Sequence, residues 1–229
     1  MLQRDYPPPS LVDRLRSRSI LRTGEAVRWG WRQVQRFGAI APGSPRAAKF
    51  GSFGNGSVMC FPFETIVNEC AIHVGEQTII APYVALSAGW MPDQPKLANA
   101  IVTIGSYCVI GRGSSIIGHE SIVIGDGVWT GPFVHITDCN HDYHDRTMPI
   151  GWQAMDPKPI TIGDGSWLGH GTIVLPGTTI GRNVTIGANS VVMGDIPDYA
   201  VAVGSPARVV RTYDPAIDDW TATRYDTSP

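Results

Sequence analysis

The sequence predicts an all-β fold built as a solenoid of parallel strands. The main observation is an aliphatic residue at every sixth position from 162 to 192, namely Ile162, Leu168, Val174, Ile180, Ile186 and Val192. A small residue follows it at most steps, as in Ile162-Gly163 and Ile180-Gly181. A period of six fits neither the 3.6 of a helix nor the two of a half-buried strand. It is typical of a solenoid in which each hexapeptide forms one flat face and three form a triangular coil.

Composition agrees with one main domain. A chain of 229 residues with 43% hydrophobic content can bury a sizeable core. Its 26 glycines suit a fold with many corners, where Gly, Asn and Asp supply backbone angles that larger residues resist. The fixed period argues against low complexity as the reason for so much glycine.

The same period can be followed upstream, with interruptions. It begins at Val74, Ile80 and Leu86, resumes at Ile104 and slips by two before Ile124. The slip falls on Gly118-His119-Glu120, which is either a tolerated corner or an outward bulge that aims side chains at a ligand. Residues 88–100 and 138–160 interrupt the repeat as loops, and loops of the second length are often functional.

The chain outside the repeat forms an N-terminal arm and a C-terminal tail. In residues 1–50 we expect two helices, one capped by Ser10 and one starting at Thr23, followed by a linker at Ala41–Pro45. Residues 51–212 then form the solenoid. Residues 213–229 form a tail that we expect to be ordered only if it docks.

Charge is distributed unevenly along the chain. Residues 1–50 hold ten Lys or Arg against three Asp or Glu, whereas the remainder holds eight against seventeen. The arginine-rich helices either pack as a cap on the solenoid or attract an anionic partner such as coenzyme A phosphate, an acidic glycan or a membrane surface. Nucleic acid is not expected as a partner, because the whole chain is slightly acidic and carries no recognised binding motif.

Cysteine usage and hydropathy predict a cytoplasmic protein. The four cysteines are widely spaced and form no CxxC pair that would suggest zinc or a redox dithiol. We identify neither a signal peptide nor an apolar run approaching the roughly 20 residues of a membrane span.

The hexapeptide period resembles that of the hexapeptide-repeat acyltransferases, whose fold is a left-handed parallel β-helix. The segment 136–143, Ile-Thr-Asp-Cys-Asn-His-Asp-Tyr, resembles the Thr-Asp-x-Asn-His-x-Tyr segment of bacterial polysaccharide O-acetyltransferases. It is also similar, with one residue added, to the Thr-x-Thr-His segment of the maltose and galactoside acetyltransferases. In both groups the histidine is the general base, which implies that role for His141. His144 does not align.

The resemblance also implies an acyl-CoA site. Residues 162–170 match the family's Ile-Gly-x-x-x-Trp-Ile-Gly segment, so Trp167 and Gly169 would border the pantetheine arm. The backbone N–H of His170 would face the thioester oxygen as the oxyanion donor, and the main chain of Ala188 would bond the pantetheine. Near the end of the repeat, Arg208 and Arg211 would meet coenzyme A phosphate.

Residues for the acceptor follow from the same resemblance. Asn140 belongs to the histidine motif, and Met155 aligns with a methionine that lines the acceptor site. His119, beside Glu120, takes the bulge position that is acidic in the sugar acetyltransferases, so the acceptor can differ from a simple hexoside. Met193 and Gly194 replace a Thr-Lys pair that is frequent in the family.

The expected activity is direct transfer of an acetyl or other short acyl group from acyl-CoA to a sugar or polysaccharide hydroxyl, without a metal. His141 takes the acceptor proton, because imidazole titrates near neutrality, and the His170 amide stabilises the oxyanion. Asp142 or a main-chain carbonyl orients the imidazole. The resemblance implies a homotrimer with each site between neighbouring subunits.

Two other readings stay open. A zinc carbonic anhydrase on the same fold would need a His-x₄-His signature, but Ile124 stands five residues after His119; His141 and His144 are the remaining metal candidates. A non-enzymatic scaffold would bind acidic partners through its basic arm and would not need the histidine motif.

Overall fold

The computed structural model describes residues 11–223 and the side chains of residues 20–223. It divides the chain into two compact units, one ending at Gly38 and the other starting at Ala39. The expected Ser10 cap lies outside the described residues.

Residues 11–38, the described part of the first unit, form one helix, α1 (Leu11–Gly38), where the sequence suggested two. Thr23 and Gly24 do not interrupt it. An internal glycine costs about 1 kcal/mol relative to alanine, and the Leu, Arg, Glu and Ala residues around it are good helix formers. One side of α1 carries Ile20, Val27 and Val34 at heptad spacing.

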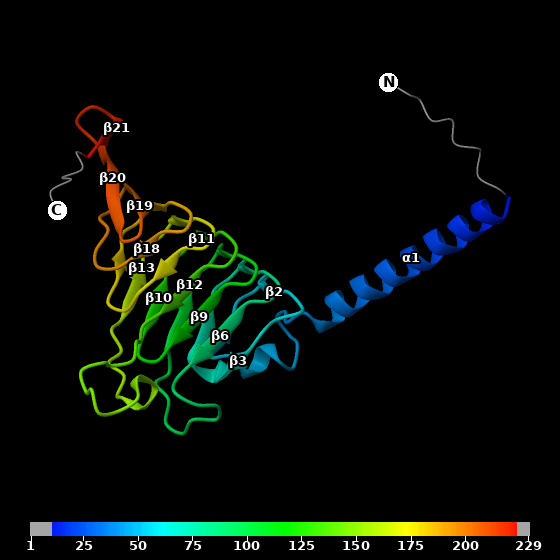
Figure 1. Ribbon diagram of the computed structural model, residues 1–229, viewed down its shortest axis with the longest axis horizontal. Coiled ribbons are helices and arrows are strands. Elements are labelled where there is room, and N and C mark those ends of the chain that lie inside the picture. The colour runs from blue at the N-terminus through cyan, green and yellow to red at the C-terminus, as the bar shows by residue number, and fades with distance from the viewer. Residues whose placement is uncertain (1–10, 224–229) are drawn as a thin grey trace. The chain divides into compact units, whose positions relative to one another are not determined.

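The second unit is a coil of short parallel strands arranged in three sheets, which we call faces 1, 2 and 3 (Figure 1). The chain visits them in the order 1, 2, 3 and then returns to face 1 one coil further along. Face 1 contains β1 (Ser52–Phe53), β4 (Ile72–Val74), β7 (Val102–Ile104), β10 (Ile122–Ile124), β13 (Ile160–Ile162) and β16 (Thr179–Ile180).

The other faces are built in the same way. Face 2 contains β2 (Val58–Met59), β5 (Ile79–Ile80), β8 (Val109–Ile110), β11 (Trp129–Thr130), β14 (Trp167–Leu168), β17 (Thr185–Ile186) and β19 (Ala200–Gly204). Face 3 contains β3 (Ile66–Val67), β6 (Ala85–Ala88), β9 (Ser115–Gly118), β12 (His135–Thr137), β15 (Ile173–Val174) and β18 (Val191–Val192). Short 3₁₀ helices occupy Ala47–Lys49, Glu69–Ala71 and Ile150–Trp152.

The period-six residues form the core, as predicted. Within residues 162–192 all six aliphatic positions are at most 1% exposed. Equivalent residues stack in register from coil to coil, as Ile104, Ile124 and Ile162 do on face 1. Each buried aliphatic side chain contributes about 1.5–3 kcal/mol.

Aspartates close the corner between faces 1 and 2. The Asp126 carboxylate accepts a hydrogen bond from the Ser106 N–H at 2.7 Å, Asp164 from the Asp126 N–H at 2.8 Å, and Asp198 from the Arg182 N–H at 2.9 Å. Backbone N–H groups at this corner that are not bonded between strands therefore donate to aspartate carboxylates along this edge.

Both ends of the predicted solenoid lie elsewhere than expected. The chain joins the solenoid already at Ile40, which pairs with Met59 and is 2% exposed. Ala47 and Phe50 are buried in the same core, whereas residues 41–45, expected as a linker, are exposed or half-buried. At the other end β20 (Ala207–Asp214) and β21 (Asp219–Ala222) add antiparallel strands to face 2. Residues 213–222, expected in a tail, are therefore held by a strand ladder.

Candidate functional site

Two loops leave the coil at the corner between faces 3 and 1. Residues 89–101 follow β6, and residues 138–159 follow β12, at the positions where the repeat is interrupted (Figure 1). The Gly118-His119-Glu120 bulge follows β9 at the same corner, in the coil between the two loops. The irregularities in the repeat therefore gather on one edge.

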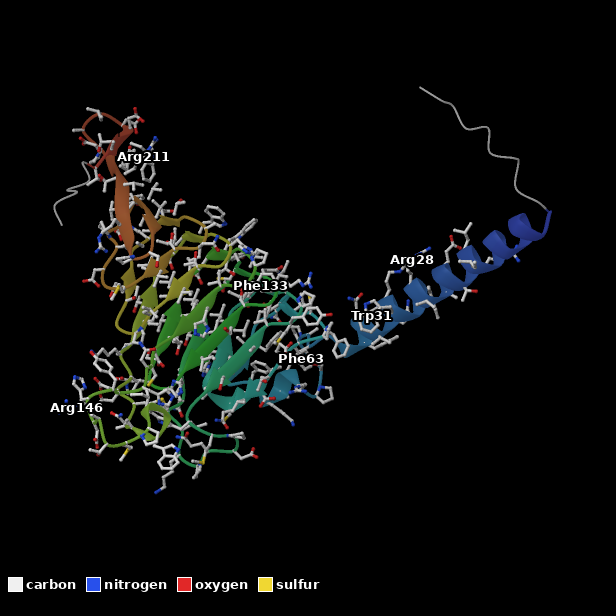
Figure 2. The ribbon with its side chains drawn as sticks, viewed as in Figure 1. Arg28, Trp31, Phe63, Phe133, Arg146 and Arg211 are labelled. Carbon is white, nitrogen blue, oxygen red and sulfur yellow. The ribbon has the colours of Figure 1, made fainter. Side chains whose placement is uncertain are left out.

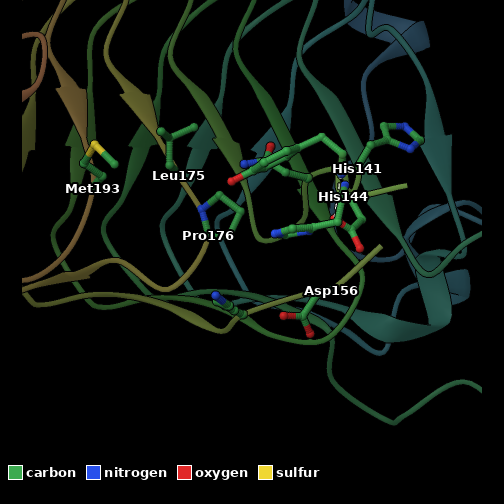
Figure 3. Close-up of a pocket in the computed structure, with 10 residues that line it drawn as sticks. His141, His144, Asp156, Leu175, Pro176 and Met193 are labelled. Atoms are coloured by element: carbon green, nitrogen blue, oxygen red, sulfur yellow. Dashed lines mark hydrogen bonds and ion pairs between the residues drawn. The ribbon is translucent and has the colours of Figure 1, made fainter. Parts of the chain in front are cut away.

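His141 lies in a pocket of about 360 Å³ at this corner (Figure 3). Its backbone forms an antiparallel bridge with Met155, and the Asp142 N–H donates to the Ala154 carbonyl at 2.9 Å. The structure thus brings Asn140, His141 and Met155 together, as the sequence predicts for an acceptor site. Their catalytic and binding roles stay predictions.

Besides the segment 140–144, four residues that sequence reasoning did not assign to this site line the pocket. They are Asp156, Lys158, Leu175 and Pro176. Lys158 is tied to the edge by its backbone, because its N–H donates to the Asp138 carbonyl at 2.7 Å. Met193, noted only as a departure from the family pattern, lines the pocket as well. No sequence signal could have found these residues, because they come from three separate segments.

The Asp142 carboxylate makes no hydrogen bond to the His141 ring. It accepts hydrogen bonds from the His144 side chain and from the backbone N–H groups of Tyr143 and His144. The His144 side chain is the main cause that holds the pKa of Asp142 below its ordinary value. Within residues 20–223 the His141 ring has no hydrogen-bond partner. Asp142 as the residue that orients His141 is therefore not supported in a single chain.

The predicted acyl-CoA residues lie at a different corner, between faces 2 and 3. Trp167 points outward from β14, is 48% exposed and pairs in register with the exposed Trp129. His170 and Ala188 occupy equivalent positions in successive coils. Neither backbone N–H has an acceptor in the described part of the chain, in contrast to the aspartate-paired corner.

Glycines lie directly against these backbone nitrogens in the preceding coil. A Cβ on Gly131 would lie 2.6 Å from the His170 nitrogen, and one on Gly169 would lie 2.6 Å from the Ala188 nitrogen. Phe133 packs edge-on against the His170 ring with centroids 5.6 Å apart. This corner therefore offers a row of open hydrogen-bond donors beside exposed aromatic rings, an arrangement suited to an amide-bearing chain or a developing oxyanion.

Arg208 and Arg211 are exposed on β20, beyond the last complete coil; Figure 2 labels Arg211 there. Arg208 donates to the Ala207 carbonyl at 3.0 Å. Both arginines lie in the same sheet as Trp167, and their guanidinium groups stay candidates for phosphate binding.

Between residues 20 and 223 no group of three or more His, Cys, Asp or Glu side chains is placed to hold a metal ion. None of the helices in residues 11–223 combines the length and apolarity needed to cross a membrane.

Both the sequence and the fold of the chain resemble those of known proteins. Residues 159–194 match the family described as bacterial transferase hexapeptide (six repeats). The chain is 34% identical over 148 residues to galactoside O-acetyltransferase of Escherichia coli, covering 65% of this chain and 67% of that protein. The chain belongs to the hexapeptide-repeat acetyltransferase family.

Other relatives cover less of the chain or share only the fold. "Probable acetyltransferase Rv3034c" of Mycobacterium tuberculosis is 43% identical over 107 residues, which span 47% of this chain but only 36% of that protein. AntD, an N-acyltransferase from Bacillus cereus solved with dTDP and 3-hydroxybutyryl-CoA, superimposes with a TM-score of 0.63. It is 22% identical and covers 75% of this chain and 88% of its own, which shows that the hexapeptide-repeat fold is shared.

Proposed function

We propose that this protein is an acyl-CoA-dependent O-acyltransferase that moves an acetyl or other short acyl group to a sugar or polysaccharide hydroxyl. The observation that carries the proposal is that the chain has both His141 in its pocket and, at a second corner, open backbone N–H groups at His170 and Ala188. The first supplies a base and the second supplies oxyanion donors, the two requirements of acyl transfer.

His141 deprotonates the acceptor hydroxyl, and the resulting alkoxide oxygen attacks the thioester carbonyl carbon. The carbonyl oxygen becomes an oxyanion that accepts a hydrogen bond from the His170 N–H. Collapse of the tetrahedral intermediate breaks the carbon–sulfur bond and releases the thiolate, which recovers the proton from His141. Trp167 borders the pantetheine arm, and the arginines of β20 meet the phosphates. Membership of the family supports this assignment and a left-handed coil.

One chain cannot complete this site. His141 belongs to the corner after face 3, whereas His170 belongs to the corner before it. The chain crosses that face from Gly169 to Leu175, six steps that span about 20 Å at the rise of a β-strand. A general base must lie within hydrogen-bond reach of the hydroxyl proton. The functional unit we propose is therefore a homotrimer in which one subunit supplies His141 and its neighbour supplies the His170 corner.

Binding of the donor is the first test. Acetyl-CoA, propionyl-CoA, succinyl-CoA and free CoA should each be added to the purified protein in a melting experiment. A ligand that binds only the folded state raises the melting temperature. We expect a clear rise with acetyl-CoA, and no rise with any of these ligands would contradict the proposed donor.

Mixing two inactive variants tests the shared site. His141→Ala removes the base, and Gly131→Ala displaces the backbone at His170, because its Cβ would lie 2.6 Å from the His170 nitrogen. Co-expression of the two should restore part of the transferase activity, because some interfaces then pair an intact His141 with an intact His170 corner. If both elements came from one chain, the mixture would stay as inactive as its parents. Light scattering should give three times the 24.7 kDa chain mass.

A further inference from the structure

The helix α1 carries an apolar stripe along one side. We define this stripe by four residues at intervals of seven, four and three, namely Ile20, Val27, Trp31 and Val34. At 3.6 residues per turn these intervals bring the four side chains onto one face of the helix. The four side chains are between 47% and 66% exposed, and a surface hollow lined by Ile20, Gly24 and Val27 lies within the stripe.

The opposite side of α1 is basic. Between residues 20 and 38 the chain has four arginines and one glutamate. Arg22, Arg32 and Arg36 fall on the side opposite the apolar stripe, whereas Arg28 borders the stripe next to Trp31. All four arginines are exposed, and Figure 2 labels Arg28 and Trp31 on the helix. The helix therefore combines an apolar strip with a net positive charge.

The apolar stripe and the arginines of α1 have no partner among the described residues of their own unit. That part of the unit, residues 11–38, is this one helix, and a single helix has no second element on which to pack its apolar face. The arginine salt bridges among the described residues involve Arg46 and Arg182, which belong to the other unit. A partner that satisfies α1 must therefore be apolar along one strip and negatively charged beside it.

An anionic membrane surface meets both requirements. A helix of this kind lies in the plane of the bilayer, with its apolar face roughly 5–10 Å deep at the boundary between headgroups and acyl chains. Headgroup phosphates then surround the flanks of the helix, where long arginine side chains reach them. A second copy of α1 would cover the stripe but would add charge of the same sign. A solenoid packed on the stripe would leave most of the arginines on the far side, in water.

We propose that α1 is a membrane-surface anchor that binds bilayers containing anionic phospholipid. The apolar stripe faces the acyl chains, Trp31 lies at the level of the headgroups beside Arg28, and the arginines bind lipid phosphates. The helix lies on the membrane and does not cross it. Because α1 supplies no residue to the pocket that holds His141, this attachment is separate from the proposed acyl transfer.

The test is sedimentation of the full chain with two kinds of vesicle, one of phosphatidylcholine alone and one with an equal share of phosphatidylglycerol. We expect the protein to bind the anionic vesicles at least about tenfold more tightly, and high salt to weaken this binding, because salt screens the attraction between arginine and anionic lipid. Arg32→Gln should weaken binding to the anionic vesicles about fivefold. Equal binding to both kinds of vesicle, or binding to neither, would overturn the proposal.

Two tryptophans of α1 test the orientation of the helix. Trp31→Ala should weaken binding to the anionic vesicles about tenfold, because the variant buries less apolar surface in the bilayer. Trp29→Ala is the matched control, since Trp29 is 61% exposed on the basic side of the same helix. This control should bind as the wild type does. Equal losses in the two variants would contradict the proposed orientation and overturn the anchor.

Other partners of α1 would give different results. If a second copy covered the stripe, Trp31→Ala would lower the mass measured by light scattering and leave vesicle binding unchanged. If the solenoid covered it, the same variant would lower the melting temperature instead. Binding to heparin without binding to vesicles would assign the arginines to an acidic glycan. Each of these outcomes would overturn the membrane anchor, whereas the melting experiment with acetyl-CoA reports on the solenoid and tests the proposed transferase independently.

Discussion

Gly131 lies beneath the backbone nitrogen of His170, so close that a Cβ on Gly131 would come within 2.6 Å of it. The absence of a side chain at position 131 therefore lets the two coils approach this closely at His170, whose N–H has no acceptor among the described residues. At the aspartate-paired corner Gly163 lies equally close to the nitrogen of Arg182, whose N–H is already bonded to Asp198. A glycine thus lies equally close to the His170 nitrogen, whose N–H has no acceptor in the described residues, and to the Arg182 nitrogen, whose N–H has one.

Gly131→Ala should lower kcat by about 10²-fold, the usual cost of losing an oxyanion donor. Gly163→Ala is the matched control, because its Cβ would meet backbone atoms at the same distance. Steady-state kinetics and melting temperatures of both variants provide the check. Equal loss of activity in the two would assign the effect to general strain.

His141→Ala should lower kcat by about 10²–10⁴, the range for general acid–base catalysis. His144→Ala, in the same pocket, should change kcat much less, since His144 is paired with Asp142. A near-normal rate in His141→Ala would remove His141 from the role of base.

Asp142→Asn should leave kcat and its pH dependence close to those of the wild type. The Asp142 carboxylate bonds His144 and not the proposed base. The measurement is the pH–rate profile of the variant. A loss approaching that of His141→Ala would show that Asp142 reaches His141 in the assembled enzyme.

Trp167→Ala should raise the KM for acetyl-CoA about tenfold, equivalent to about 1.4 kcal/mol of lost binding, with the acceptor KM unchanged. Trp167→Phe should retain part of the affinity for acetyl-CoA. Trp29→Ala is a control for loss of an exposed indole in α1, outside the solenoid unit. Ligand-dependent melting and initial rates together test the donor contact, and an unaltered response in Trp167→Ala would exclude it.

His135 predicts a pH-dependent loss of stability. Burial lowers the pKa of His135 below its ordinary value of about 6.5. As the pH falls below that value the unfolded chain binds a proton that the folded protein resists, so unfolding becomes easier until the pH passes the folded pKa. In urea unfolding, the free energy of unfolding of His135→Gln should rise relative to that of the wild type between pH 7 and pH 5, compared with their difference at pH 8. A constant difference across this range would contradict the prediction.

The solenoid could be predicted from the amino-acid sequence alone, and the motif around His141 could be found in it. A period of six can be satisfied only by stacking coils, so Ile162, Leu168 and their equivalents had to form the core. Interruptions of the period located both loops. The continuous helix α1 and the terminal strands β20 and β21 were missed, because Gly24 was too weak a breaker and antiparallel pairing leaves no period.

Which side chains meet could not be predicted from the sequence. Asp142 follows His141 directly in the sequence, but its carboxylate accepts a hydrogen bond from the His144 ring. Asp138 and His119 are 19 positions apart and meet because successive coils place them at one corner. His141 and His170 stand at different corners of the triangle. Period and spacing specify the coil, but the direction of each side chain depends on hydrogen bonds between coils, which no local pattern contains.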